Sequence, residues 1–120
     1  MNSEEFARII RDLNQISDDV QLTIDKKFFS LSVKSEFIEG SLVYKNGKSV
    51  NEEKLVKMNV SSKHSGVYSL KFLNDFCRAS PLSETVVLYF SANTPLVVDF
   101  SIGSYGNLRY FLAAKMTSDD

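Results

Sequence analysis

The apolar residues of the first segment recur every three or four positions, and they are Phe6, Ile9, Ile10, Leu13 and Ile16. This spacing predicts an amphipathic helix over about residues 4–16. Ser3 is expected to cap its start, because a serine hydroxyl accepts a hydrogen bond from an unpaired N–H of the first turn. Arg8 and Arg11 are three residues apart, so they are expected together on the polar side of this helix.

After residue 19 the pattern changes to an alternation of apolar and polar residues, which is typical of strands with one buried face. The predicted strands cover residues 20–24, 29–33, 37–44, 56–60, 85–91, 96–102 and 108–113, with a further possible strand over 63–68. Asn46-Gly47 is a turn signal after the third of these. Gly103 and Gly106 are expected in a hairpin turn between the last two strands.

A second helix is predicted from Leu70, with Leu73, Phe76 and Cys77 on its apolar side, and it is expected to end before Pro81. The fold class is therefore α+β, with two helices packed on one side of antiparallel sheets. Helix and strands follow one another twice along the chain. The second helix has a strand before it, whereas the first has only two residues before its cap, so the first unit is expected to lack its opening strand.

Length and composition fit one globular domain, since the chain has 120 residues, 43% of them hydrophobic, and a formal net charge of -1. This near-neutral charge argues against binding nucleic acid by bulk attraction. A single cysteine excludes an internal disulfide. No apolar run approaches the roughly 18 residues that span a bilayer. The acidic start is not a signal peptide, and residues 115–120 are expected to form a frayed polar tail.

Catalysis finds little support in the residue pattern. His64 and Cys77 are the only histidine and cysteine of the chain, and they supply neither a catalytic set nor a zinc cluster. His64 lies in a polar stretch and is expected at the surface, while Cys77 is expected to be a buried, inert thiol. We predict no catalytic residue, no metal and no cofactor.

The basic residues of the two helices are Arg8, Arg11, Lys71 and Arg78. One interpretation is that any exposed helix face is charged. The other is that both helices pack on one face of a common sheet, so that these cations point the same way and contact phosphates weakly, without sequence preference. The second interpretation expects the acids to lie elsewhere, as Glu52, Glu53, Asp119 and Asp120 do in the sequence.

Several motifs in the same order resemble the C-terminal domain of proliferating cell nuclear antigen, the eukaryotic sliding-clamp family. They are EFARIIRDL (5–13), LKFLN (70–74), SPLS (80–83), PLVVDF (95–100) and LRYFLA (108–113). The likeness extends from about Ser3 to Lys115, and residues 45–63 match only in outline. It implies a DNA-clamp fold, with residues 1–120 as a single domain that lacks the opening strand and the N-terminal domain of a clamp subunit.

The resemblance also implies a function. Subunits of this family close into a ring around duplex DNA in the nucleus, where the ring is a polymerase processivity factor in replication and repair. A clamp loader and other clamp subunits are implied partners, and no membrane is. Arg8, Arg11, Lys71 and Arg78 match the basic positions of the inner surface, which the resemblance makes DNA-contacting.

Partner proteins of the family carry a short motif with a glutamine and two aromatic residues. The matching receptor positions here are Ser69, Phe72, Pro95, Tyr110, Phe111, Leu112 and Ala113, with Ala114 and Lys115 continuing the backbone that would receive the extended peptide. Ala114 stands where the family usually has proline, which implies a less rigid groove floor. The matching subunit-interface strand is Gly40, Ser41, Leu42, Val43, Tyr44 and Lys45.

Two alternatives stay open. The chain could be a stand-alone peptide-binding module that neither forms a ring nor contacts DNA. An enzyme is a more distant reading, because the sequence contains no nucleophile with an adjacent base. For the aromatic run Tyr110-Phe111-Leu112, simple strand packing competes with peptide binding, since at least one of three consecutive strand residues is expected in the core.

Overall fold

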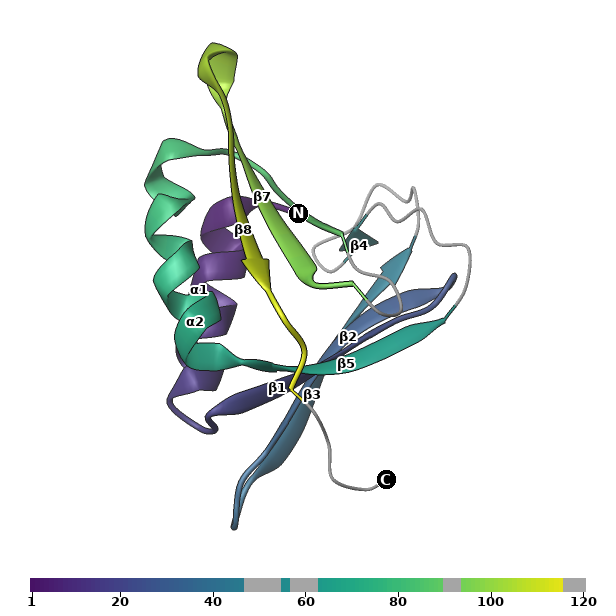
Figure 1. The fold of residues 1–120 in the computed structure, drawn as a ribbon. Coiled ribbons are helices and arrows are strands. Elements are labelled where there is room, and N and C mark those ends of the chain that lie inside the picture. Colours follow the sequence, from purple (N-terminus) through teal and green to yellow (C-terminus); the bar gives the residue numbers. More distant parts are fainter. Residues whose placement is uncertain (47–54, 57–62, 90–93, 116–120) are drawn as a thin grey trace.

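Two helices lie side by side along one side of two β-sheets (Figure 1). The computed structural model describes residues 1–46, 55–56, 63–89 and 94–115. The elements are α1 (Ser3–Asn14), β1 (Asp19–Ile24), β2 (Phe28–Lys34), β3 (Glu39–Asn46), β4 (Leu55–Val56), β5 (His64–Ser69), α2 (Leu70–Phe76), the 3₁₀ segment η1 (Cys77–Leu82), β6 (Val86–Tyr89), β7 (Leu96–Ile102), the 3₁₀ turn η2 (Gly103–Tyr105) and β8 (Gly106–Leu112).

The strands form two sheets. One has the order β4-β3-β2-β1-β5 and the other the order β6-β7-β8. All described pairs are antiparallel except β3 with β4, which run parallel over two residues. The predicted α+β class with two helices against antiparallel sheets is therefore confirmed. Gly103 and Gly106 have φ angles of 48° and 120° in the β7–β8 hairpin turn, a conformation that glycine adopts without strain.

The start of α1 differs from the prediction. Asn2, and not Ser3, is the cap, and its side-chain oxygen accepts from the Glu5 N–H at 2.9 Å. Ser3 is fully buried, and its hydroxyl donates to the carbonyls of Ser83 and Ser80. The helix also ends earlier than expected, at Asn14, because the next N–H groups bond three residues back, as in a 3₁₀ turn.

The second helical segment is a short α-helix that continues as a 3₁₀ helix. The α-helix α2 ends at Phe76, before Pro81 as expected, and the 3₁₀ helix η1, which was not expected, continues through Pro81 to Leu82. A 3₁₀ helix occurs commonly at the end of an α-helix. Ser69 caps α2, with its side-chain oxygen 3.4 Å from the Phe72 nitrogen.

α1 and α2 run in opposite directions, and contacts at both ends fix this arrangement. The Ser3 hydroxyl reaches Ser80 in η1 at 3.3 Å, so the start of α1 lies beside the end of the second helical segment. The Leu70 N–H donates to the Asp18 carbonyl at 2.9 Å, so the residues after α1 lie beside the start of α2. Arg78 therefore lies alongside the first half of α1, and Lys71 alongside its end.

A single core fills the space between the helices and both sheets. From α1 it takes Phe6, Ile10 and Leu13, and from α2 Leu70 and Leu73. The five-stranded sheet contributes Val20, Leu22, Phe29, Leu31 and Val33, and the three-stranded sheet Val86, Leu96, Val98 and Phe100. The alternation of apolar residues in the sequence predicted the inward positions of the five-stranded sheet at Val20, Leu22, Phe29, Leu31 and Val33.

Both ends of the described chain bond to strands. Met1 pairs with Val86, donating to its carbonyl at 3.1 Å and accepting from its N–H at 2.9 Å. The two residues before α1 thus lie beside β6. The Lys115 N–H donates to the Val67 carbonyl of β5 at 2.7 Å, so the expectation that Lys115 begins a frayed tail is wrong for this residue. Residues 116–120 lie outside the described residues.

Parts of two predicted strands also lie outside the described residues. Of the expected strand 56–60 only Val56 is described, and it forms β4 together with Leu55. Gly47 of the expected turn is outside as well, and so are residues 90–91 of the strand that follows η1.

We expect Tyr68→Phe to stabilise the chain. Tyr68 is fully buried, and its hydroxyl has no hydrogen-bond partner among the described residues. Removing an unpaired buried hydroxyl should raise the free energy of unfolding by roughly 1 kcal/mol, measured by chemical denaturation.

The matched control is Tyr44→Phe. The Tyr44 hydroxyl donates to the Glu5 carboxylate at 3.2 Å, so its removal should lower the free energy of unfolding by about 1 kcal/mol. Equal destabilisation by both changes would contradict the prediction for Tyr68.

Candidate functional site

The four basic positions lie on exposed parts of the helices. In α1, Arg8 stands midway between the buried Phe6 and Ile10, so at 100° per residue it lies opposite the buried side. Arg11 is exposed on the neighbouring part of the same surface. Lys71, in the first turn of α2, and Arg78, in η1, are exposed too. The helix side of the molecule thus presents cations from both helical segments.

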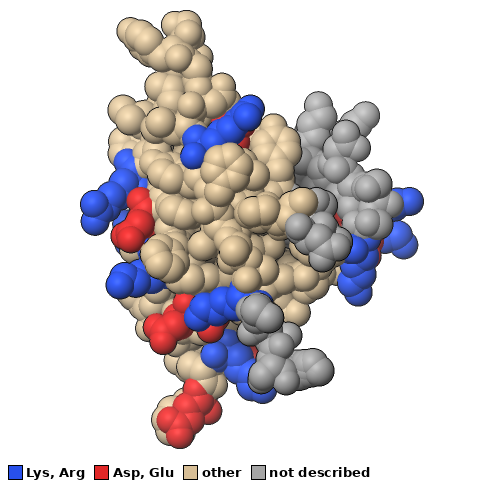
Figure 2. All heavy atoms as spheres, viewed as in Figure 1, with Lys and Arg blue, Asp and Glu red and all other residues tan. Residues whose placement is uncertain are grey.

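Acidic residues share this surface, contrary to the expectation that they lie elsewhere. Asp12 is exposed on α1, with its carboxylate 3.8 Å from Arg11, and Glu4 and Asp75 are exposed as well. Figure 2 shows basic and acidic side chains together over the helices, at the left of the view. The acids named earlier, Glu52, Glu53, Asp119 and Asp120, lie outside the described residues. The helix surface is therefore mixed in charge and cannot attract DNA strongly.

The predicted peptide-binding residues lie around the junction of β8 with α2. Tyr110 is half-buried and stacks on Phe76 of α2, with ring centroids 4.6 Å apart and planes 10° apart. Phe111 points the other way and is 64% exposed, and Phe72 on α2 is 51% exposed. Tyr110 and Leu112 pack against the core, so the strand-packing interpretation holds for these two residues and not for Phe111.

Two sets of contacts bring the remaining members together. Leu96 pairs with Leu112, which places Pro95 beside Ala113. The bond from Lys115 to Val67 then brings residues 113–115 to β5, just before Ser69. The Lys115 ammonium also lies 2.6 Å from the carboxylate of Asp19, the cross-strand partner of Ser69. The segments around Pro95, residues 112–115 and Val67–Ser69, which are far apart in the sequence, are thus brought next to one another.

The sequence reasoning missed two neighbours of Phe111. Tyr89 pairs with Val97, and Val97 pairs with Phe111, so the three form one row across the outer face of the β6-β7-β8 sheet. Tyr89 is 52% exposed. The sequence contained a signal for both, because Tyr89 and Val97 are apolar residues at strand positions that alternate with the buried ones. This row extends the apolar surface away from Pro95.

The predicted interface strand, residues 40–45, lies within β3. Over Gly40–Tyr44 its outer edge faces no strand in the described parts of the chain, because β4 pairs only with Lys45 and Asn46. Ser41 and Val43 are exposed, whereas Tyr44 is buried. The Tyr44 side chain belongs to the core, and burial together with the Glu5 carboxylate raises its pKa to about 12. Another strand would therefore contact the main chain of β3 at this residue and not the Tyr44 side chain.

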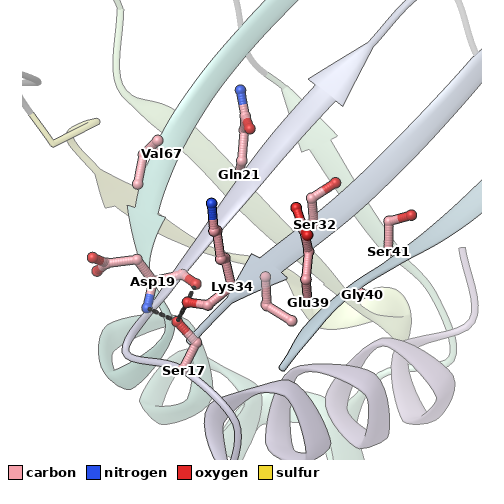
Figure 3. Close-up of a pocket in the computed structure, with 10 residues that line it drawn as sticks. Ser17, Asp19, Gln21, Ser32, Lys34, Glu39, Gly40, Ser41 and Val67 are labelled. Carbon is pink, nitrogen blue, oxygen red and sulfur yellow. Dashed lines mark hydrogen bonds between the residues drawn. The ribbon is translucent and has the colours of Figure 1, made fainter. Parts of the chain in front are cut away.

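A polar hollow of about 540 Å³ lies on the outer face of the five-stranded sheet. Its lining includes Asp19, Gln21, Ser32, Lys34 and Ser41 (Figure 3). In that view Gln21, Ser32 and Ser41 point away from the helices. Part of its lining, including Gly40 and Ser41, belongs to β3, so the hollow adjoins the predicted interface strand.

The sequence profile described as "Proliferating cell nuclear antigen, C-terminal domain" matches residues 1–115. The chain belongs to the proliferating cell nuclear antigen family. The resemblance seen in the sequence is therefore confirmed, and so is the fold that it implied. The proliferating cell nuclear antigen family consists of non-enzymatic DNA clamps that act in nuclear replication and repair.

Cys77 and His64 are the two residues considered above as possible starting points of a catalytic set. Cys77 is 5% exposed, and burial raises the pKa of its thiol to about 12, which leaves almost no thiolate near neutral pH. His64 is half-buried at the start of β5. No group of three potential metal ligands occurs in the parts of the chain that the structure describes, and none of the described helices is long and apolar enough to cross a membrane.

We expect Cys77 to resist thiol reagents at pH 8 in the folded chain and to react fully in denaturant, which a chromogenic disulfide reagent measures. The same burial predicts a pH dependence. The folded thiol keeps its proton up to a pKa of about 12 against 9.0 as the ordinary value, so stability is complete below pH 9 and falls as the pH rises beyond it.

Cys77→Ala should remove the decline between pH 9 and 10, below the ordinary pKa of the buried tyrosines. Rapid labelling of Cys77 in the folded chain would contradict its inert role.

Proposed function

We propose that this chain is one domain of a sliding clamp, which encircles duplex DNA when assembled in a ring and recruits polymerase and other replication and repair proteins in the nucleus. The observation that carries the proposal is the antiparallel helix pair with Arg8, Arg11, Lys71 and Arg78 exposed on it. Membership of a DNA-clamp family supports it.

The charge of the helix surface suits sliding better than tight binding. The three helical segments carry these four cations together with Glu4, Glu5, Asp12 and Asp75. Such a surface contacts phosphates weakly and without sequence preference. A ring holds DNA by enclosing it, so weak contacts suffice and do not arrest movement along the duplex.

Assembly into the ring is proposed to use the free edge of β3. Main-chain groups of Gly40 to Tyr44 would pair with a strand of another clamp subunit or domain, extending the five-stranded sheet across the interface, while Lys45 pairs with β4 within the chain. A clamp loader is a further partner of the assembled ring. The polar hollow of Figure 3 would lie at this junction.

Partner proteins with the glutamine-and-aromatic motif are proposed to bind at the junction of β8 and α2. Phe72 on α2 and Phe111 on β8 offer exposed aromatic area, Pro95 lies beside Ala113, and residues 113–115 offer main-chain groups to an extended peptide. Ser69 and Tyr110 position this surface through the α2 cap and the stack on Phe76. Ala114 supplies no proline ring, but Lys115 holds the segment through its bond to β5.

Replacing Arg8, Arg11, Lys71 and Arg78 with alanine should weaken binding to duplex DNA. Each lost phosphate contact should reduce the slope of log affinity against log salt by about 0.9. Fluorescence anisotropy of a labelled duplex, titrated with the assembled clamp at several salt concentrations, measures this slope.

The control replaces Lys26, Lys27 and Lys63, which are exposed outside the helices, and should leave the slope almost unchanged. An equal loss in both variants would refute the inner-surface role.

Phe111→Ala should reduce the affinity for a motif peptide about tenfold or more, because the lost aromatic contact stabilises binding by roughly 2 kcal/mol. Titration calorimetry with a peptide containing one glutamine and two aromatic residues measures the change. Phe111 is largely exposed, so the fold should be unaffected.

Leu82→Ala is the control, since Leu82 is 62% exposed in η1 and lies outside the proposed site. Unchanged affinity in the Phe111 variant would place peptide binding elsewhere.

A further inference from the structure

β8 carries an exposed cation on the same face as Phe111. Side chains two residues apart in a strand point to the same face, so Arg109 and Phe111 both lie on the outer face of the β6-β7-β8 sheet. The Arg109 side chain is 59% exposed. Within the described strands β6, β7 and β8, the only charged residues are Asp99 and Arg109. The formal charge that these strands present to a partner therefore comes from this pair.

The acid of this pair is buried and the base is exposed. Asp99 is the cross-strand partner of Arg109 and is only 4% exposed. Its Oδ2 atom accepts from the Arg109 Nε at 3.2 Å, and its Oδ1 atom accepts from the Asn107 side-chain amide at 2.8 Å. Both carboxylate oxygens thus have donors from β8. A partner at this face meets the guanidinium and not the carboxylate.

The bond to Asp99 also orients the guanidinium. It uses the Nε atom, and among the described residues no acceptor is bonded to the terminal Nη atoms of Arg109. These Nη groups can hold a second carboxylate with two parallel hydrogen bonds. A guanidinium that is already held in place loses less conformational freedom on binding. Arg109 is therefore arranged to bind a carboxylate of a partner.

The order of the peptide-binding residues along β8 decides which part of a peptide reaches Arg109. In the function proposed above, residues 113–115 receive the extended start of the motif, and Phe111 contacts its aromatic residues. Arg109 comes next on the same strand, about 7 Å beyond Phe111. A peptide that continues in this direction places the residues after its aromatic pair beside Arg109.

We propose that Arg109 selects those partner peptides that carry an aspartate or glutamate about two or three residues after the aromatic pair of the motif. The side-chain carboxylate accepts from the Nη groups of Arg109, whereas a lysine or arginine at the same place is repelled. This inference rests on the proposed peptide-binding function and adds a charge preference to it. Arg109 is thereby a specificity-determining residue of the peptide site.

The size of this effect suits a choice between partners better than a main source of affinity. An exposed ion pair changes an equilibrium constant by about two- to fivefold. The aromatic contact at Phe111 contributes about tenfold or more, so it dominates the affinity of every peptide with the motif. Arg109 then discriminates between peptides that share the aromatic pair. Salt should weaken this preference, because it screens exposed charges.

Titration calorimetry of the full chain with three matched peptides tests the proposal. The peptides share the motif and end in an amide, and they carry glutamate, glutamine or lysine at the second position after the aromatic pair. At low salt, glutamate should bind about two- to fivefold more tightly than glutamine, and lysine most weakly. Equal affinities would overturn the inference and leave the peptide site in place. If none of the three binds, the peptide site itself is overturned, and the inference with it.

Variants at Arg109 assign the preference to this side chain. Arg109→Gln combined with Asp99→Asn removes both charges, so it leaves neither an unpaired buried carboxylate nor a changed net charge. The preference for glutamate over glutamine should then fall to near onefold, and Arg109→Gln alone should act in the same direction. Arg109→Lys keeps the cation and should keep the order of the three peptides. Loss of the order in Arg109→Lys, or the parent preference in either glutamine variant, would overturn the role of Arg109.

Two controls separate this contact from general charge effects. Lys27→Gln removes an exposed cation between β1 and β2 and should keep the parent preference. A peptide with its glutamate before the glutamine of the motif places this acid near residues 113–115, where the Arg109 variants should not alter its effect. An equal response to the Arg109 variants at both peptide positions would overturn the proposed placement.

Discussion

Burial of one side of α1 is the interaction on which the rest of this structure depends. Phe6 and Ile10 are at most 1% exposed, and the cluster they join includes Val20 and Leu22 from one sheet and Val98 from the other. Each such side chain stabilises the fold by about 1.5–3 kcal/mol. A helix is rigid, so fixing this side toward the sheets fixes the opposite side toward solvent. The exposure of the α1 arginines is thus a consequence of the core.

Those parts of the fold that depend on local periodicity could be predicted from the sequence. The alternation through Val20, Leu22 and Leu31 and the three-four spacing through Ile10 identified the buried faces correctly. The role of Ser3 could not be predicted, because its partner Ser80 is 77 residues away in the chain. A serine before two glutamates has the local pattern of a cap, and only the tertiary contact shows that it is buried instead.

The sequence predicted which segments form the candidate site, but not which way their side chains point. The family motifs located the run of residues 110–112, whereas the pairing of β8 with β7 decides that Phe111 faces outward beside Val97. The extent of the mixed charge on the helices was likewise missed, since Asp12 was not weighed against Arg11 beside it. The pairing of strands and the charges that surround a side chain depend on the folded structure, so the pattern of residues along the chain does not show them.

Lys115 fastens the end of β8 to the other sheet, through its N–H to Val67 and its ammonium to Asp19. A partner that binds residues 113–115 would therefore contact a segment that is also hydrogen-bonded to β5. By thermodynamic linkage, such a partner would stabilise the contact of Lys115 with β5, and an intact contact would in turn favour binding. A partner bound at residues 113–115 would thus also stabilise the contact between the two sheets.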